Sequence, residues 1–133
     1  MNIIKDLKCK NYSIFTGTVG ENRKIVVELN DGENTKYFLK IPTTQSAKEL
    51  VQNEAKSLKF LEQYEFKLLD FPKVAYSDEK VVVISNIKPN QKVENGKFRN
   101  IHILALEEMY LQTYKPLKIN EVKIFLRHKK AEY

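Results

Sequence analysis

One continuous stretch, residues 36–63, decides the fold of this protein: KYFLKIPTTQSAKELVQNEAKSLKFLEQ. Its opening residues alternate as a strand does, and Pro42, which has no amide hydrogen to donate, ends that strand. A helix is predicted over residues 46–63, where Ser46 and Glu49 match a capping box. Apolar residues recur in this helix at three- and four-residue spacing and make one stripe: Ala47, Leu50, Val51, Ala55, Leu58 and Leu61.

Two charged residues in this stretch occupy positions where the pattern calls for apolar ones. Lys40 lies between Leu39 and Ile41 in the strand, and Glu54 projects from the apolar stripe of the helix. A charge buried alone costs on the order of several kcal/mol, so we expect the two to pair across the strand–helix contact. A lysine held in this way presents its ammonium to phosphate oxygens. Either residue alone could instead lay its stem on apolar surface and reach solvent with its charge.

The segments before this stretch predict the rest of a three-stranded antiparallel meander. Tyr12–Thr16 and Lys24–Leu29 alternate in the manner of strands, and residues 30–32, Asn-Asp-Gly, favour a hairpin turn. The turn between the first two strands carries two glycines, which let backbone amides approach an anion closely. Its candidate anion-binding residues are Gly17, Thr18 and Gly20. Many hairpins carry two glycines, so the motif alone is weak evidence for an anion site. The position of this turn, ahead of the strand that contains Lys40, is the stronger evidence.

The segments after it predict a strand pair and further helices. Residues 68–76 lead into the pair, and Val81–Ile84 has the β-branched run of a strand buried on both faces. A connector follows at residues 88–91, then an amphipathic helix over residues 100–114 and a short helix that Asn120 can cap. The apolar side of the longer helix holds Ile101, Leu104, Ala105 and Met109. We therefore expect an α+β fold: a five-stranded antiparallel sheet with one packed helix, followed by C-terminal helices.

Composition sets limits on the class of protein. A chain of 133 residues is one ordinary domain, and its single cysteine allows no internal disulfide. No apolar run approaches the length of a signal peptide core or a membrane span, so we expect a cytoplasmic protein without a membrane partner. The net charge of +6 suits anionic ligands, from nucleotides to RNA to acidic lipid, and does not choose among them.

The order of these features resembles the N-terminal lobe of kinase-like phosphotransferases. After the glycine-bearing turn come Phe38-Leu39-Lys40, Asn53-Glu54-Ala55, Phe71-Pro72-Lys73-Val74 and the segment Val81–Ile87. The chain looks closer to the aminoglycoside phosphotransferase and choline kinase group than to protein kinases, whose glycine loop holds more glycines and whose strand has a small residue where Phe38 stands. The resemblance covers about residues 12–90.

The resemblance implies a nucleotide site in residues 1–89 and, in residues 90–133, a connector and helices like the start of a C-terminal lobe. Lys40 would contact the phosphates of ATP and Glu54 would orient it. The glycine turn would cover the phosphates, and residues 85–87 would offer backbone groups to the adenine edge, with Ile84 behind. The candidate nucleotide-binding residues are Gly17, Thr18, Gly20, Lys40, Glu54, Ser85 and Ile87.

The carboxylates that this family uses for catalysis are missing from the expected place. The family's catalytic and metal-binding aspartates follow the hinge, whereas Asp6, Asp31, Asp70 and Asp78 all precede residue 86. Neither histidine begins a His-x-Asp pattern. We therefore name no catalytic residue and no metal ligand, and expect that this chain alone neither holds Mg²⁺ nor completes phosphoryl transfer. The missing aspartates are consistent with three kinds of protein: a truncated gene product, half of a split enzyme, or a surviving binding module.

Two other interpretations remain open. A basic α+β adaptor could bind RNA or a partner protein through Lys97, Arg99 and the lysines after residue 115, with an affinity that falls as salt rises. Nucleic acid has little support, because aromatic residues are not interleaved with the basic ones. Alternatively, apolar side chains without a C-terminal lobe to cover them could bind such a lobe on another polypeptide or drive self-association: Ile101, Leu104, Met109, Phe125 and Leu126.

Overall fold

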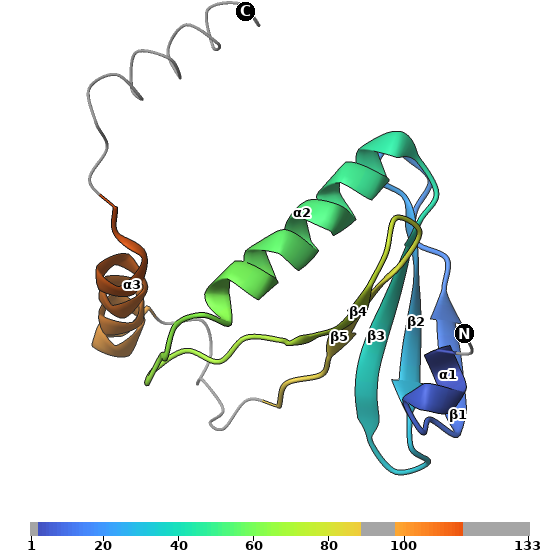
Figure 1. The fold of residues 1–133 in the computed structure, drawn as a ribbon, viewed down its shortest axis with the longest axis horizontal. Helices are drawn as coiled ribbons and strands as arrows, with labels where there is room; N and C mark the ends of the chain where they lie inside the picture. Colours follow the sequence, from blue (N-terminus) through green and yellow to red (C-terminus); the bar gives the residue numbers. More distant parts are fainter. Residues whose placement is uncertain (1–2, 89–97, 116–133) are drawn as a thin grey trace, which may run out of the picture.

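The computed structural model, which describes residues 3–88 and 98–115, contains a five-stranded antiparallel sheet with one long helix against one face (Figure 1). The strand order is β1-β2-β3-β5-β4. In chain order the elements are α1 (Ile3–Asp6), β1 (Asn11–Phe15), β2 (Lys24–Asn30), β3 (Thr35–Pro42), α2 (Gln45–Leu61), β4 (Val74–Ser77), β5 (Val82–Ser85) and α3 (Asn100–Thr113). The predicted α+β sheet and its packed helix are confirmed. Residues 89–91 of the predicted connector 88–91, and the predicted helix after Asn120, lie outside the described residues.

The start of α2 differs from the prediction. The N-cap is Thr44, not Ser46, because the backbone is still extended at Thr44 (φ −134°, ψ 164°). The amide of Ala47 donates to the Thr44 hydroxyl at 3.1 Å, which satisfies one of the unpaired amides of the first turn. Ser46 therefore lies inside the helix. The predicted capping box was wrong, whereas the predicted helix was right.

The core lies between α2 and the sheet. It consists of Val51, Ala55, Leu58, Val82 and Ile84, with Phe38, Phe71 and Val74 packed against it. The helix turns one narrow stripe toward β3, β4 and β5, so Leu50, on the flank of that stripe, is 50% exposed. The predicted stripe was thus broader than the face that is buried.

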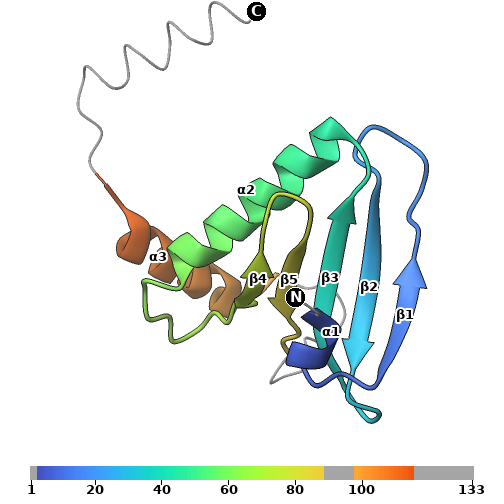
Figure 2. The same cartoon turned by 45° about the vertical axis from the view of Figure 1, so that its right-hand side comes forward.

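The opposite face of the sheet also carries buried side chains. Val27, Leu29 and Val83 are buried there, and the short helix α1 crosses this side, in front of the strands in Figure 2. Because Val82, Val83 and Ile84 alternate between the two faces and are all buried, the prediction that this strand is covered on both sides is confirmed. The sequence pattern did not predict α1, which is too short to show a helical period.

The helix α3 lies beside the C-terminal end of α2 and buries none of its residues (Figure 1). The amides of Lys67 and Leu68 donate to the carboxylate of Glu108 and hold the helix to the connector between α2 and β4. Apolar residues such as Ile103 and Leu106 lie on other sides of α3 than Leu104, so the prediction of a single apolar side was wrong. No helix within the described ranges is both long and apolar enough to cross a membrane.

Candidate functional site

Lys40 occupies the middle of the sheet, on the face that α2 covers. Phe15, Val26, Lys40 and Val82 are paired in one row across β1, β2, β3 and β5. Side chains that lie opposite one another on antiparallel strands share a face. Apolar neighbours therefore flank the Lys40 stem on both sides, and its side chain is only 15% exposed.

Glu54 reaches Lys40 from the helix. The Lys40 ammonium donates to Oε1 of Glu54, and the two form an ion pair between β3 and α2. The carboxylate is 34% exposed and thus partly in water, whereas the ammonium is largely covered. The predicted contact between these two residues is confirmed. A covered lysine with one carboxylate partner is a fixed positive charge that can hold an anion in place.

The loop between β1 and β2 has one position that requires glycine. Gly17 has φ +68°, and a Cβ on it would lie 2.9 Å from the carbonyl oxygen of Lys24, so a side chain there would be strained and crowded. Gly20 is different, because a Cβ there would meet nothing within 4 Å. The two predicted glycines therefore differ in role. The backbone conformation of the loop requires glycine at position 17, whereas the space around Gly20 would also accommodate a side chain.

A hollow of 360 Å³ is formed by this loop together with the sheet. Residues 17–24 line it, including Thr18, and so do Phe15 and Val26. Since Phe15 and Val26 belong to the row that contains Lys40, the hollow opens on the same face of the sheet as the ion pair. Lys40 lies beside the hollow on the next strand and is not part of its lining.

Sequence reasoning missed two residues, Thr43 and Thr44, which attach the loop to α2. The Thr43 hydroxyl donates to the carbonyl of Arg23 at 2.8 Å, and its amide donates to the same oxygen at 3.1 Å. The Thr44 hydroxyl donates to the carbonyl of Glu21. The pair of threonines after Pro42 was the available signal, because threonine is a common N-cap residue.

The segment after β5 uses part of its backbone within the sheet. The Ser85 amide donates to Lys73 and the Asn86 amide donates to Lys36, both at 2.8 Å, while the Lys73 amide donates to the Ser85 hydroxyl. Ile87, the next predicted site residue, is exposed. The register places Ser85 opposite Tyr37, three residues along the strand from the level of Lys40. Ser85 and Ile87 therefore lie toward the other end of β3, about 10 Å or more from the ion pair.

Two of the aspartates stabilise turns. The amides of Asn34 and Glu33, and then Lys36, lower the pKa of Asp31 to about 2. The amides of Lys80 and Val81, and then the Tyr76 hydroxyl, lower the pKa of Asp78 below its usual value.

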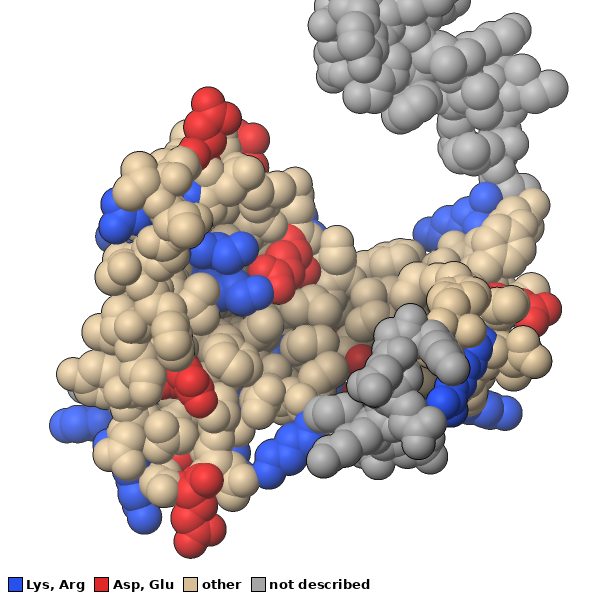
Figure 3. All heavy atoms as spheres, turned by 180° about the vertical axis from the view of Figure 1, so that it is seen from behind, with Lys and Arg blue, Asp and Glu red and all other residues tan. Residues whose placement is uncertain are grey.

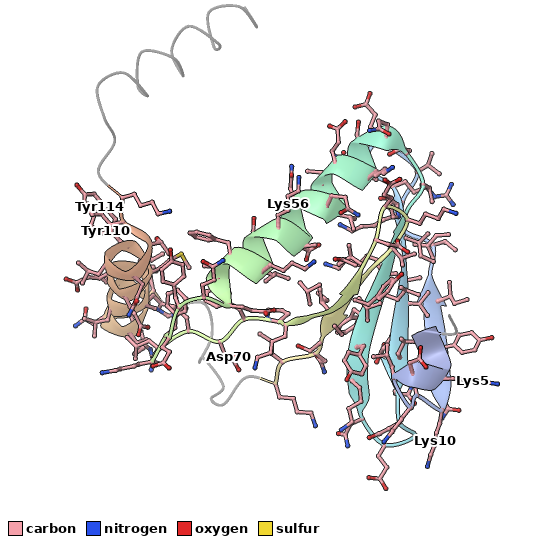
Figure 4. All side chains as sticks on the ribbon, in the orientation of Figure 1. Lys5, Lys10, Lys56, Asp70, Tyr110 and Tyr114 are labelled. Carbon is pink, nitrogen blue, oxygen red and sulfur yellow. The ribbon has the colours of Figure 1, made fainter. Side chains whose placement is uncertain are left out.

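A third aspartate lies away from the ion pair. Asp70 lies in the connector between α2 and β4, toward the α3 end of the molecule (Figure 4). Over residues 3–88 and 98–115, no three His, Cys, Asp or Glu side chains are placed to hold a metal ion.

A cavity larger than this hollow lies away from the ion pair. It measures 600 Å³ and is lined by residues of the α2–β4 connector and by Gln112 of α3. Neither Lys40 nor the glycine loop contributes to it. On the face shown in Figure 3, Lys and Arg side chains are spread over several parts of the surface, and some lie beside Asp and Glu side chains.

Five antiparallel strands with one helix packed against one face make a fold like that of a kinase-like N-terminal lobe. Solved structures of aminoglycoside phosphotransferases share it. The gentamicin complex of APH(2'')-IIa has a TM-score of 0.52 at 18% identity, over 68% of this chain and 27% of that chain. The streptomycin–ATP–APH(2'')-IIa ternary complex has a TM-score of 0.52 at 19% identity, over 68% and 28%.

The ADP-bound aminoglycoside phosphotransferase APH(2'')-Ib has a TM-score of 0.51 at 18% identity, over 67% of this chain and 27% of that chain. At such identities the likeness is one of fold, and it confirms the expected kinase-like lobe. The chain spans little more than a quarter of the length of these structures. No protein-family model and no curated protein matches its sequence.

Proposed function

We propose that this chain is a nucleotide-binding domain that takes ATP, built like the N-terminal lobe of a small-molecule phosphotransferase. The ion pair of Lys40 with Glu54 carries the proposal, because the same arrangement positions nucleotide phosphates in kinases. The hollow under the glycine loop, on the same face of the sheet, supports it. Two of the similar structures contain ATP or ADP, which is consistent with a nucleotide ligand.

Different residues of the chain would contact different parts of ATP. Lys40 would contact phosphate oxygens with little loss of freedom on binding, since Glu54 already orients its ammonium. Backbone amides near Gly17 and Gly20 would approach the phosphates. Because the amide of Ser85 is already used in the sheet, the base edge would meet the Ser85 carbonyl and the backbone of Ile87.

We further propose that these residues bind nucleotide without completing phosphoryl transfer. That reaction needs a carboxylate for the acceptor hydroxyl and ligands for Mg²⁺. No aspartate follows Asp78 in the sequence, and among the described residues Asp31 and Asp78 are engaged in turns. The residues present do not fit a magnesium site, so we assign the chain no step that involves the metal.

Replacing the lysine tests the nucleotide site. Lys40→Ala should weaken ATP binding about tenfold to a hundredfold, because it removes a charge-assisted hydrogen bond to phosphate. Isothermal titration calorimetry measures the affinity, and circular dichroism checks that the variant folds. Lys48→Ala is the matched control, since Lys48 is an α2 lysine with a 40% exposed side chain that is paired loosely with Glu79 at 3.9 Å.

Two results would contradict the proposal. If titration of wild-type protein with ATP gives no binding heat, with or without Mg²⁺, the chain does not bind this nucleotide. Equal weakening in the Lys40→Ala and Lys48→Ala proteins would show that general positive charge, rather than the ion pair, attracts the ligand.

A further inference from the structure

We propose that Thr44 is a positioning residue that couples the glycine loop to α2, so that the loop and the Glu54 that holds Lys40 keep one relative placement. The coupling itself rests only on the observed hydrogen bonds. Its expected effect on ATP affinity rests in addition on the proposed nucleotide-binding function. The basis of the coupling is one hydroxyl that serves two elements. The Thr44 hydroxyl donates to Glu21 in the loop and accepts from the amide of Ala47 in the first turn of α2.

The loop is attached to the same point by a second residue. The carbonyl of Arg23 accepts from both the amide and the hydroxyl of Thr43, and the Arg23 amide donates to Gly20 at 3.1 Å. The Arg23 side chain also donates, through Nε, to the carbonyl of Thr16 at the start of the loop. Every residue of the loop from Thr16 to Asn22 is exposed, so packing contributes little to its placement. Hydrogen bonds, including those to Thr43 and Thr44, therefore contribute more than packing to holding the loop in place.

The helix extends this attachment to the ion pair. Thr44 caps the single helix α2 that carries Glu54. A helix packed on a sheet moves as one body, so a shift of α2 that carried Glu54 away from Lys40 would also pull on the Glu21 carbonyl. Conversely, a loop held against an anion favours the placement of α2 in which the ion pair forms. Each half of the site then stabilises the other.

Substitutions at Thr44 can separate the two bonds of the hydroxyl. Thr44→Val keeps the β-branched shape and loses both. Thr44→Asp keeps the acceptor for the Ala47 amide, as a common N-cap residue does, and cannot donate to Glu21. Thr44→Ser keeps both. Ser46→Asp is the matched control, because it adds the same charge to the first turn of α2 without touching the loop.

Hydrogen exchange of two amides, followed by NMR without nucleotide, measures separately how well the helix cap and the loop are held. The Ala47 amide reports the cap and the Arg23 amide reports the loop. In Thr44→Asp we expect the Arg23 amide to exchange about fivefold faster while Ala47 stays protected. In Thr44→Val both amides should exchange faster, and in Thr44→Ser and Ser46→Asp neither should. An Arg23 amide that exchanges equally fast in wild type and Thr44→Asp would overturn the coupling.

ATP titration of the same proteins tests what the coupling does. Thr44→Asp should bind ATP about fivefold more weakly than Ser46→Asp, and Thr44→Ser should bind like wild type. Equal affinities for Thr44→Asp and Ser46→Asp would overturn the positioning role. The two proposals fail differently: wild-type protein that does not bind ATP would remove the nucleotide function, whereas the exchange rates would still show whether the loop is tied to α2.

Discussion

A lysine on a covered sheet face is stable only where something compensates its charge. In this molecule one carboxylate does so, and the two partners are not equally covered, since Glu54 is about twice as exposed as Lys40. The carboxylate keeps part of its hydration while the ammonium gives up most of its own, which limits the desolvation cost of the pair. Glu54 therefore fixes the orientation of the Lys40 ammonium, which can bind a second anion.

Another single residue, Asp31, makes the hairpin between β2 and β3 sensitive to acid. Its folded pKa of about 2 lies below the ordinary value of 3.8, so its contribution to stability is present above about pH 4 and is lost as the pH falls toward 2. Asp31→Asn should therefore be less stable than wild type at pH 5, and the difference should shrink by pH 2. Urea unfolding at several pH values measures this.

The control for Asp31 is a second carboxylate in the same turn. Glu33→Gln removes one negative charge from an exposed position beside it. If both variants show the same loss of stability at pH 5, net charge rather than the hydrogen bonds from Asn34 and Glu33 stabilises the turn.

At the scale of elements, α2 depends on a narrow contact. Its buried residues are Ala47, Val51, Ala55 and Leu58, and two of these are alanines, so the helix approaches the sheet closely. Glu54 belongs to the flank of this face, next to Ala55, which is why its carboxylate can reach β3 without full burial. The same close packing makes the position of α2 sensitive to the volume of its few large side chains.

Two leucines of α2 should differ strongly in their contribution to folding. Leu58 is 8% exposed within the core, and Leu58→Ala should reduce the free energy of unfolding by about 2–5 kcal/mol. Leu50 is 50% exposed, and Leu50→Ala should reduce it by about 1 kcal/mol or less. Urea denaturation compares the two. Equal losses would mean that α2 lies rotated from the orientation described above.

At the scale of the whole molecule, α3 is the part without a core. Its apolar residues face solvent on several sides, and polar bonds to the α2–β4 connector hold it. Exposed apolar side chains in such number are typical of a surface that another protein covers. The rings of Tyr110 and Tyr114, 5.1 Å apart, extend outward from it (Figure 4).

We expect this chain to self-associate through α3 when no other polypeptide covers it. Leu104→Glu combined with Leu111→Glu should shift the protein toward monomer, because the association would bury like charges. Sedimentation velocity over a range of concentrations measures the shift. Val19→Glu is the control, since Val19 is 89% exposed but stands alone in the glycine loop. A wild-type monomer at all concentrations would contradict the expectation.

Much of this architecture could be predicted from pattern. The period of two in β2 and β3, the β-branched run of β5 and the helical period of α2 each predicted an element that is present. The Lys40–Glu54 contact could also be predicted, because two charges in apolar positions leave few other solutions. The candidate nucleotide role stays a prediction for all seven site residues, since no ligand contact tests it: Gly17, Thr18, Gly20, Lys40, Glu54, Ser85 and Ile87.

The sequence by itself determined the order of the strands and the two longer helices, and the one pair of charges that must meet, because periodicity and the cost of burying charge are local properties of the chain. Only the tertiary structure decided that the hydroxyl of Thr44 also holds the glycine loop, since Glu21 and Thr44 meet through the pairing of β2 with β3. It also decided that Leu50 and α3 remain exposed, because burial depends on what lies opposite a face.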